Sequence, residues 1–397
     1  MRNVLHYQEK MKSKFYIFML VPPIVSLPWV FIKFLSFHTG FYTNTILSGI
    51  SIVCAAFYLA WASDSLRRDV SGALSMALVA LIAVLPEYGV DMYLSFKAGQ
   101  DISYAQFAAA NMTGANRLLI GFGWALVVLL SRGKEVILPQ ERRSDATILA
   151  VATLWCFTLS FRKHISLIES IVLISLFFMY IKRISSEEVE DFENESEPVR
   201  TIISYTRFKR ILVSCSMFIW SGFCILISVE SFSEGLIHIG KSLNIDEFLL
   251  IQWIAPLASE SPELIIASIW AVKGRPSDSI TTLISSKINQ WTLLIGMIPI
   301  VFNISRFFVS SSFSSLPLDP RQVEEVFLTC AQSIFAYSVI LDLRFSKREA
   351  VLLFVLFSSQ LFIPSMPVRY IFSAIYIFLT FVWIVIKLKS SGREKNT

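Results

Sequence analysis

Two pairs of acidic residues lie inside long apolar stretches of the sequence, where charges are costly. Glu87 and Asp91 form the first pair, and Glu260 and Glu263 form the second. An ionisable side chain at the centre of a membrane helix costs about 2.5–3.5 kcal/mol on insertion scales, so four unpartnered acids would cost on the order of 10 kcal/mol. Spacings of three or four residues place the members of each pair on one helix face. We therefore expect both pairs to face the interior of a helix bundle.

A Pro-Glu dipeptide occurs in each half of the chain, at residues 86–87 and at residues 262–263. Proline lacks a backbone N–H and frees the carbonyl four residues before it. The sequence thus predicts unwound backbone near the middle of both helices, around Ala83 and Ser259. Bare carbonyls beside carboxylates offer only oxygen ligands, which hard cations such as Ca²⁺ prefer. The repetition of this arrangement favours a cation site.

The composition indicates that these residues are held by membrane helices. Of the 397 residues, 54% are apolar and only 16% are charged, whereas soluble domains have about 25% charged residues. The 33 Phe and nine Trp residues would cover a soluble surface with apolar groups. This composition excludes a soluble protein and gives no reason to expect a nucleic-acid partner; the expected partners are the lipid bilayer and small cations.

We predict an all-α, polytopic membrane protein with about 12 transmembrane helices. A helix needs about 20 apolar residues to cross the hydrocarbon layer, and such segments recur along the whole chain. The predicted spans are 15–37, 42–62, 73–96, 103–131, 145–161, 164–183, 209–233, 246–272, 277–305, 323–341, 349–364 and 368–388.

Successive loops between the predicted spans alternate between many and few basic residues. With a cytoplasmic N-terminus, about 25 basic residues fall on the inner side and about 8 on the outer side, as the positive-inside rule requires. We therefore predict a multi-pass protein of the cell membrane with both termini in the cytoplasm. The inner loops contain Arg132, Lys134, Arg142 and Arg143 in the first half, and Arg344, Lys347 and Arg348 in the second.

The two halves of the chain repeat one another. A lysine follows the Pro-Glu glutamate by ten residues in both halves, and the next span contains Leu-Leu-Ile-Gly at 118–121 and at 293–296. We divide the chain into a first repeat at 41–183 and a second repeat at 209–365, each with five helices. An odd number of spans inserts the second repeat upside down, so the repeats should be inverted, with central helices broken at Pro-Glu.

Three segments lie outside these repeats. Residues 1–40 contain an N-terminal tail and an extra helix, and residues 366–397 contain another helix and the C-terminal tail. Between the repeats, residues 184–208 are rich in Glu, Asp and Ser. This composition favours a solvated cytoplasmic linker, and a regulatory cation-binding loop is the alternative.

Motifs of other functional classes are missing from the sequence. The five Cys are scattered through apolar stretches, which fits neither a disulfide framework nor a thiolate metal site. His-Glu-x-x-His and the paired-aspartate signature of intramembrane proteases are missing too. We therefore expect neither an enzyme nor a bound cofactor.

The cores of both repeats resemble the sodium/calcium exchanger superfamily of cation antiporters. Its repeats carry Gly-Thr-Ser-Leu-Pro-Glu in one helix and a Gly-Ser-Asn-x-x-Asn/Asp stretch in the next. This chain has Ile-Ala-Val-Leu-Pro-Glu at 82–87 and Ala-Ser-Glu-Ser-Pro-Glu at 258–263. The partner stretches are at 110–117 and 285–290. The resemblance covers roughly residues 73–131 and 246–300.

The resemblance implies roles for individual residues. The family's glutamates and the carbonyls before them bind the divalent cation, which implies these roles for Glu87, Glu263, Ala83 and Ser259, with Asp91 and Glu260 nearby. In the second repeat, the spacing from Glu263 places Ser286 and Gln290 at the second-helix ligand positions. In the first repeat the register is open between Asn111/Ala115, Thr113/Arg117 and Ala115/Leu119, so its candidate ligands are Asn111, Thr113 and Asn116.

Two basic residues depart from the family pattern. Arg117 and Lys287 add positive charge beside the expected site. One interpretation is that they stand in for a sodium ion and leave proton coupling to the glutamates. Another is that they neutralise the acids in a structural ion-pair cluster.

These observations predict a secondary active antiporter of sodium/calcium exchanger type that exchanges Ca²⁺, or a related cation, against H⁺ or Na⁺. The alternative is a membrane scaffold or sensor that does not transport and keeps a degenerate ion site.

Overall fold

The computed structural model describes residues 19–37, 39–66, 69, 85–184, 196–361, 363 and 365–394, and nearly all of them are helical. The elements along the chain are the helix Met19–Phe34, followed by α2 (Phe41–Leu66), α4 (Leu85–Gln100), η1 (Ile102–Tyr104), α5 (Ala105–Leu118), the π-helix η2 (Leu119–Trp124), α6 (Ala125–Leu130), β1 (Glu135–Ile137), α7 (Arg142–Arg162), β2 (His164–Ile165), α8 (Leu167–Ile184), α9 (Glu197–Ile203), α10 (Arg207–Leu243), α11 (Glu247–Val272), α12 (Pro276–Asn289), the π-helix η4 (Gln290–Leu294), α13 (Ile295–Ser310), β3 (Leu316–Pro317), α14 (Pro320–Val339), β4 (Arg344–Ser346), α15 (Lys347–Leu361) and α16 (Met366–Glu394).

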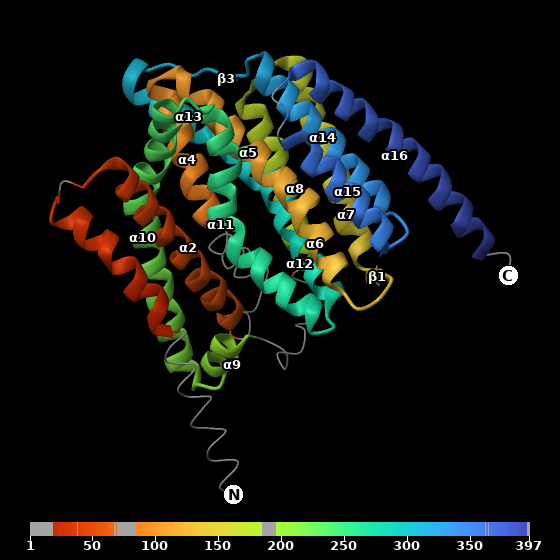
Figure 1. The fold of residues 1–397 in the computed structure, drawn as a ribbon, viewed down its shortest axis with the longest axis horizontal. Coiled ribbons are helices and arrows are strands. Elements are labelled where there is room, and N and C mark those ends of the chain that lie inside the picture. Colours follow the sequence, from red (N-terminus) through yellow and green to blue (C-terminus); the bar gives the residue numbers. More distant parts are fainter. Residues whose placement is uncertain are drawn as a thin grey trace, which may run out of the picture. The chain divides into compact units, whose positions relative to one another are not determined.

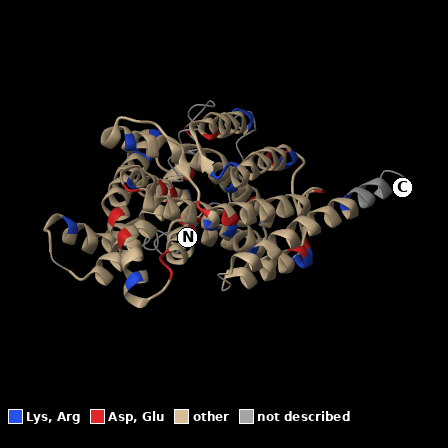
Figure 2. Ribbon diagram, turned by 90° about the horizontal axis from the view of Figure 1, so that it is seen from above, with Lys and Arg blue, Asp and Glu red and all other residues tan. Residues whose placement is uncertain are grey.

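Each predicted span overlaps a helix of the described chain (Figure 1). Six are long and apolar enough to cross a membrane: Phe41–Leu66, Ile102–Leu130, Arg142–Arg162, Arg207–Leu243, Pro276–Ser310 and Met366–Lys387. Figure 2 shows long helical stretches without Lys, Arg, Asp or Glu. Three predicted features lie outside the described residues: Ala83, the first part of the predicted span 73–96 up to residue 84, and residues 185–195 of the acidic segment 184–208.

The chain forms two compact units. The first contains residues up to Tyr93, then 181–250 and 258–262, and the second contains 94–180, 251–257 and 263 onwards. Both helices that carry predicted acids, α4 and α11, contribute residues to both units.

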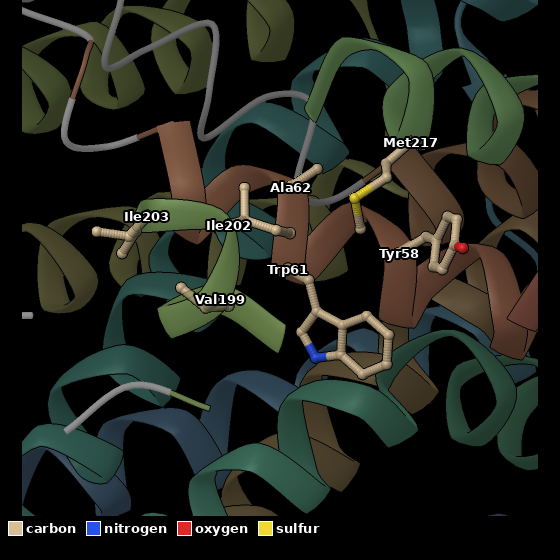
Figure 3. Close-up of a cluster of buried hydrophobic side chains, with 7 residues drawn as sticks. All are labelled: Tyr58, Trp61, Ala62, Val199, Ile202, Ile203 and Met217. Atoms are coloured by element: carbon tan, nitrogen blue, oxygen red, sulfur yellow. The ribbon is translucent and has the colours of Figure 1, made fainter. Parts of the chain in front are cut away.

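In the first unit, α2 and α10 lie side by side along most of their length (Figure 1). The short helix α9 closes one end of this pair, where its Val199, Ile202 and Ile203 join side chains of α2 and Met217 of α10 in a buried apolar cluster (Figure 3). Arg210 fixes the turn between α9 and α10, because its guanidinium binds Asp69 at 2.5 Å and also donates to the Ile203 carbonyl.

In the second unit, short strands join the two halves of the sequence. β1 pairs with β4 and β2 pairs with β3, both antiparallel. The backbone around the two pairs is closely matched: Lys163 and Leu343 are both left-handed, with φ of 59° and 62°. The Leu318 amide donates to the Lys163 carbonyl (2.9 Å), and the Leu138 amide donates to the Leu343 carbonyl (2.8 Å). The same loop geometry therefore occurs once in each half.

The helices after β2 and β4 begin with the same hydrogen bonds. The amide and hydroxyl of Ser166 donate to Glu169 at 2.6 and 2.5 Å, and those of Ser346 donate to Glu349, both at 2.8 Å. A carboxylate in the first turn satisfies backbone donors that have no partner within the helix. This Ser-x-x-Glu match extends the sequence repeat beyond the Pro-Glu cores.

The expected break at Pro262 is wrong. α11 remains helical from Glu247 to Val272, across both Pro256 and Pro262. The reason is local, since proline removes only one donor and the Ser261 hydroxyl donates to the Ala258 carbonyl at 3.1 Å. Neighbouring hydroxyl groups commonly satisfy a carbonyl that proline frees in a membrane helix. The backbone around Ser259 is therefore not unwound.

Candidate functional site

The predicted acids are removed from solvent. Glu87 and Asp91 on α4 are 3% and 0% exposed, and Glu260 on α11 is 0% exposed. Glu263 is half-buried. This burial agrees with an interior position for Glu87, Asp91 and Glu260.

The acids are divided between the two units. Glu87, Asp91, Ser259 and Glu260 belong to the first unit, whereas Glu263 belongs to the second. The approach of Glu87 to Glu263 therefore remains a prediction. Within the described ranges, no group of three or more His, Cys, Asp or Glu side chains is placed to hold a metal ion. A Ca²⁺ site in this chain would need carbonyl, amide or hydroxyl oxygens in addition to carboxylates.

The partner helices of the two repeats share an uncommon feature. α5 continues into the π-helix η2 at Leu119, and α12 continues into the π-helix η4 at Gln290. π-Helical turns interrupt the regular hydrogen-bond ladder and are frequent at functional sites. Asn116 and Lys287 each lie three residues before the π-helix that follows them.

Lys287 and Asn116 bind one another. The ammonium group of Lys287 donates to Asn116 Oδ1 at 2.7 Å and to the Asn116 carbonyl at 3.3 Å. It also lies over the Trp291 ring, 4.3 Å from the ring centroid. Both Lys287 and Asn116 are 0% exposed. A cation from the second repeat is thus bound by oxygen atoms from the first.

The other predicted second-helix ligands are buried in the same unit. Thr113 and Gln290 are 0% exposed, Asn111 is 2% exposed and Ser286 is 7% exposed. Thr113 Oγ1 accepts a bond from Gln252 Nε2 of α11 at 3.3 Å. This bond joins one predicted ligand to the helix that carries Glu263.

Arg117 has a partner that the sequence analysis did not identify. Its guanidinium binds Glu325 of α14 at 2.9 Å and lies over the Trp253 ring, 4.8 Å from its centroid. Glu325 also binds Arg369 of α16, which lies 3.5 Å from Glu324. All four charged residues are at most 1% exposed. Two arginines and two glutamates thus form a buried set whose formal charges balance.

A sequence signal for this network existed. Glu324 and Glu325 are adjacent acids inside the predicted span 323–341, and buried acids in such a span need partners. Their partners come from residues 117 and 369, more than 40 positions away in either direction, so no local spacing identifies them.

Comparisons with known proteins agree with the resemblance. A model of the sodium/calcium exchanger protein family matches residues 42–183 and 213–386. A solved structure described as the H⁺/Ca²⁺ exchanger CAX is 46% identical, with a TM-score of 0.88, and covers 96% of this chain and 95% of its own. A search of curated proteins found no match.

More distant structures share the fold alone. Two structures described as the sodium-calcium exchanger NCX_Mj, soaked with 10 mM Sr²⁺ and either 2.5 or 100 mM Na⁺, are each 17% identical with a TM-score of 0.53. Each covers 81% of this chain and 97% of its own.

Proposed function

Because this chain belongs to the sodium/calcium exchanger protein family, we propose that it is a secondary active antiporter that exchanges Ca²⁺ for H⁺ across a membrane. The observation that carries this proposal is the 46% identity, over 96% of the chain, to a protein described as an H⁺/Ca²⁺ exchanger. The buried acids on α4 and α11 supply the groups that such an exchange needs.

Glu87 and Glu263 are the proposed central ligands for the transported Ca²⁺. A divalent ion balances two carboxylates, and these repel one another when the ion leaves. Protons that neutralise the two carboxylates remove this repulsion, so Ca²⁺ and H⁺ compete for the same groups. If such a site opens to only one side of the membrane at a time, Ca²⁺ is carried in one direction and H⁺ in the other. This exchange is antiport.

The two halves are proposed to be inverted repeats. Strand pairing supports this arrangement. β1 and β3 each follow the third predicted span of their half, and β2 and β4 each follow the fourth. β1 pairs with β4 and β3 pairs with β2, so each strand pairs with the strand one span later or earlier in the other half. A two-fold axis relates such a pair of ladders. The matched bonds of Ser166 and Ser346 are what two copies of one supersecondary unit would make.

Both termini are proposed to be cytoplasmic. The β1·β4 ladder joins two loops that the basic residues place inside, and the β2·β3 ladder joins two loops placed outside. In a background without the native cysteines, we expect Lys134→Cys, beside β1, to be protected from an impermeant maleimide in intact cells. Phe313→Cys, before β3, should be labelled. The reverse pattern would disprove the orientation.

The direct test of the exchange uses purified protein in liposomes without sodium. Adding Ca²⁺ outside should drive H⁺ out of the vesicles, because each entering Ca²⁺ displaces protons from the carboxylates. A trapped pH dye and ⁴⁵Ca²⁺ uptake measure the two fluxes, with protein-free liposomes as the control. Ca²⁺ uptake that requires Na⁺ inside the vesicles would contradict proton coupling.

A further inference from the structure

Solved structures with this fold are described as exchangers for Na⁺ and for H⁺, which raises the question of what decides the coupling ion here. We propose that the ammonium group of Lys287 is a tethered cation that fills a monovalent-cation position and makes the exchanger independent of Na⁺. This inference rests on the proposed Ca²⁺/H⁺ exchange and names a specificity-determining residue for it.

The ammonium group of Lys287 is surrounded by groups of the kinds that also bind monovalent cations. Its ligands include a side-chain amide oxygen at 2.7 Å and a backbone carbonyl oxygen at 3.3 Å, both from Asn116. Neutral oxygens of these two kinds also coordinate alkali cations. The face of the Trp291 ring adds a further attraction for positive charge. A sodium ion entering this position would meet bound ligands and a fixed positive charge.

The position of Lys287 in the chain connects it to the predicted site. It follows Ser286 on α12 and precedes Gln290, the first residue of η4, by three residues; both are predicted cation ligands. Its partner Asn116 holds the equivalent position on α5 relative to the π-helix. The contact therefore joins the two partner helices just before their π-helices.

Arg117, the other buried cation proposed from the sequence, does not fit this role. Its charge is balanced by Glu325 at 2.9 Å within a set that also contains Glu324 and Arg369. Because the positive charge of Arg117 is already paired with Glu325, it cannot take the place of a coupling ion. The structure thus separates two residues that the sequence could not distinguish.

The test measures ⁴⁵Ca²⁺ uptake into liposomes that contain either Na⁺ or choline, at equal pH on both sides. Wild-type uptake should be the same with both internal cations. In Lys287→Gln and Lys287→Ser, internal Na⁺ should raise the rate of Ca²⁺ uptake by about tenfold, the change that about 1.4 kcal/mol gives. Release of ²²Na⁺ should accompany that uptake.

A matched control removes a different buried cation. The double variant Arg117→Gln/Glu325→Gln deletes one positive and one negative charge together, so the remaining Arg369 and Glu324 still balance. Its uptake should remain insensitive to Na⁺. The same Na⁺ response in this control and in the Lys287 variants would overturn the assignment to Lys287.

The remaining outcomes separate the inference from the function. Lys287 variants that exchange Ca²⁺ for H⁺ and ignore Na⁺ would overturn the inference and leave the proposed function intact. A wild-type protein that transports no Ca²⁺ without Na⁺ would overturn the proposed function itself. Loss of folded protein in both neutral variants, judged by size-exclusion chromatography, would make Lys287 a structural cation and also overturn the inference.

Discussion

Replacement of Glu87 or Glu263 by Gln is expected to abolish calcium-driven exchange and to leave the folded protein intact. Each replacement removes a negative charge but little volume, so packing around these side chains should persist. The amide retains one oxygen, yet it can neither balance the charge of Ca²⁺ nor carry a proton into the cycle. A loss of about 3 kcal/mol in ion binding corresponds to a rate at least about 100-fold lower at limiting Ca²⁺.

The measurement is Ca²⁺-driven H⁺ release from liposomes, together with size-exclusion profiles of each variant. Glu230→Gln on α10 is the matched control, because this glutamate is 56% exposed and pairs with Lys33 at 3.6 Å. Exposed ion pairs contribute about 0–1 kcal/mol, so exchange by this variant should resemble that of the wild type. If either Glu87→Gln or Glu263→Gln exchanged Ca²⁺ for H⁺ as fast as the wild type, that glutamate would not be a ligand of the transported ion.

The apolar pattern of the sequence was enough to predict the long helices, but not the short helix α9 at Glu197–Ile203, which lies in the segment 184–208. A helix that crosses a membrane needs a minimum length of apolar residues, and this length can be read from the sequence of the helix alone. For this reason the observed helices lie close to the predicted spans: α7 is Arg142–Arg162 (predicted 145–161) and α11 is Glu247–Val272 (predicted 246–272). The burial of Glu87 and Glu260 followed from the same reasoning, since the cost of an exposed charge in lipid depends only on its position along a span.

Long-range partners could not be predicted in this way. Arg117 could have bound any buried acid, and only the packing of α5 against α14 selects Glu325. The helix across Pro262 depended on one hydroxyl, that of Ser261, which a proline rule does not consider. The strands β2 and β4 are two and three residues long, too short to show any periodicity. In each case the missing information was the contact rather than the residue type.

Gly114→Ala is expected to destabilise the protein, although a glycine-to-alanine change in an open helical position is usually stabilising. A Cβ atom at residue 114 would lie 1.7 Å from the Gln252 carbonyl oxygen and 2.7 Å from its carbon. Both are backbone atoms and cannot rotate away. Pro256, four residues after Gln252, has no N–H to bind that carbonyl, and this explains why α11 can turn it toward α5.

The added methyl group would force α5 and α11 apart. That movement would break the 3.3 Å bond between Gln252 and Thr113 and disturb the helices that carry Glu263 and Asn116. Overpacking of this kind costs about 1–3 kcal/mol, more than the roughly 1 kcal/mol that alanine gains over glycine in helix propensity. We expect a lower midpoint of thermal unfolding in detergent and loss of Ca²⁺-driven H⁺ release.

Gly222→Ala on α10 provides the matched control, since a Cβ at residue 222 would meet no atom within 4 Å. The same substitution in an open helical position should stabilise the protein by about 0.5–1 kcal/mol, so the two variants should shift the unfolding midpoint in opposite directions. Equal shifts would mean that α5 and α11 do not pack through Gly114. In that case the close backbone contact at Gly114 would not hold α5 and α11 together. Other contacts would then have to fix the positions of Asn116 and Lys287.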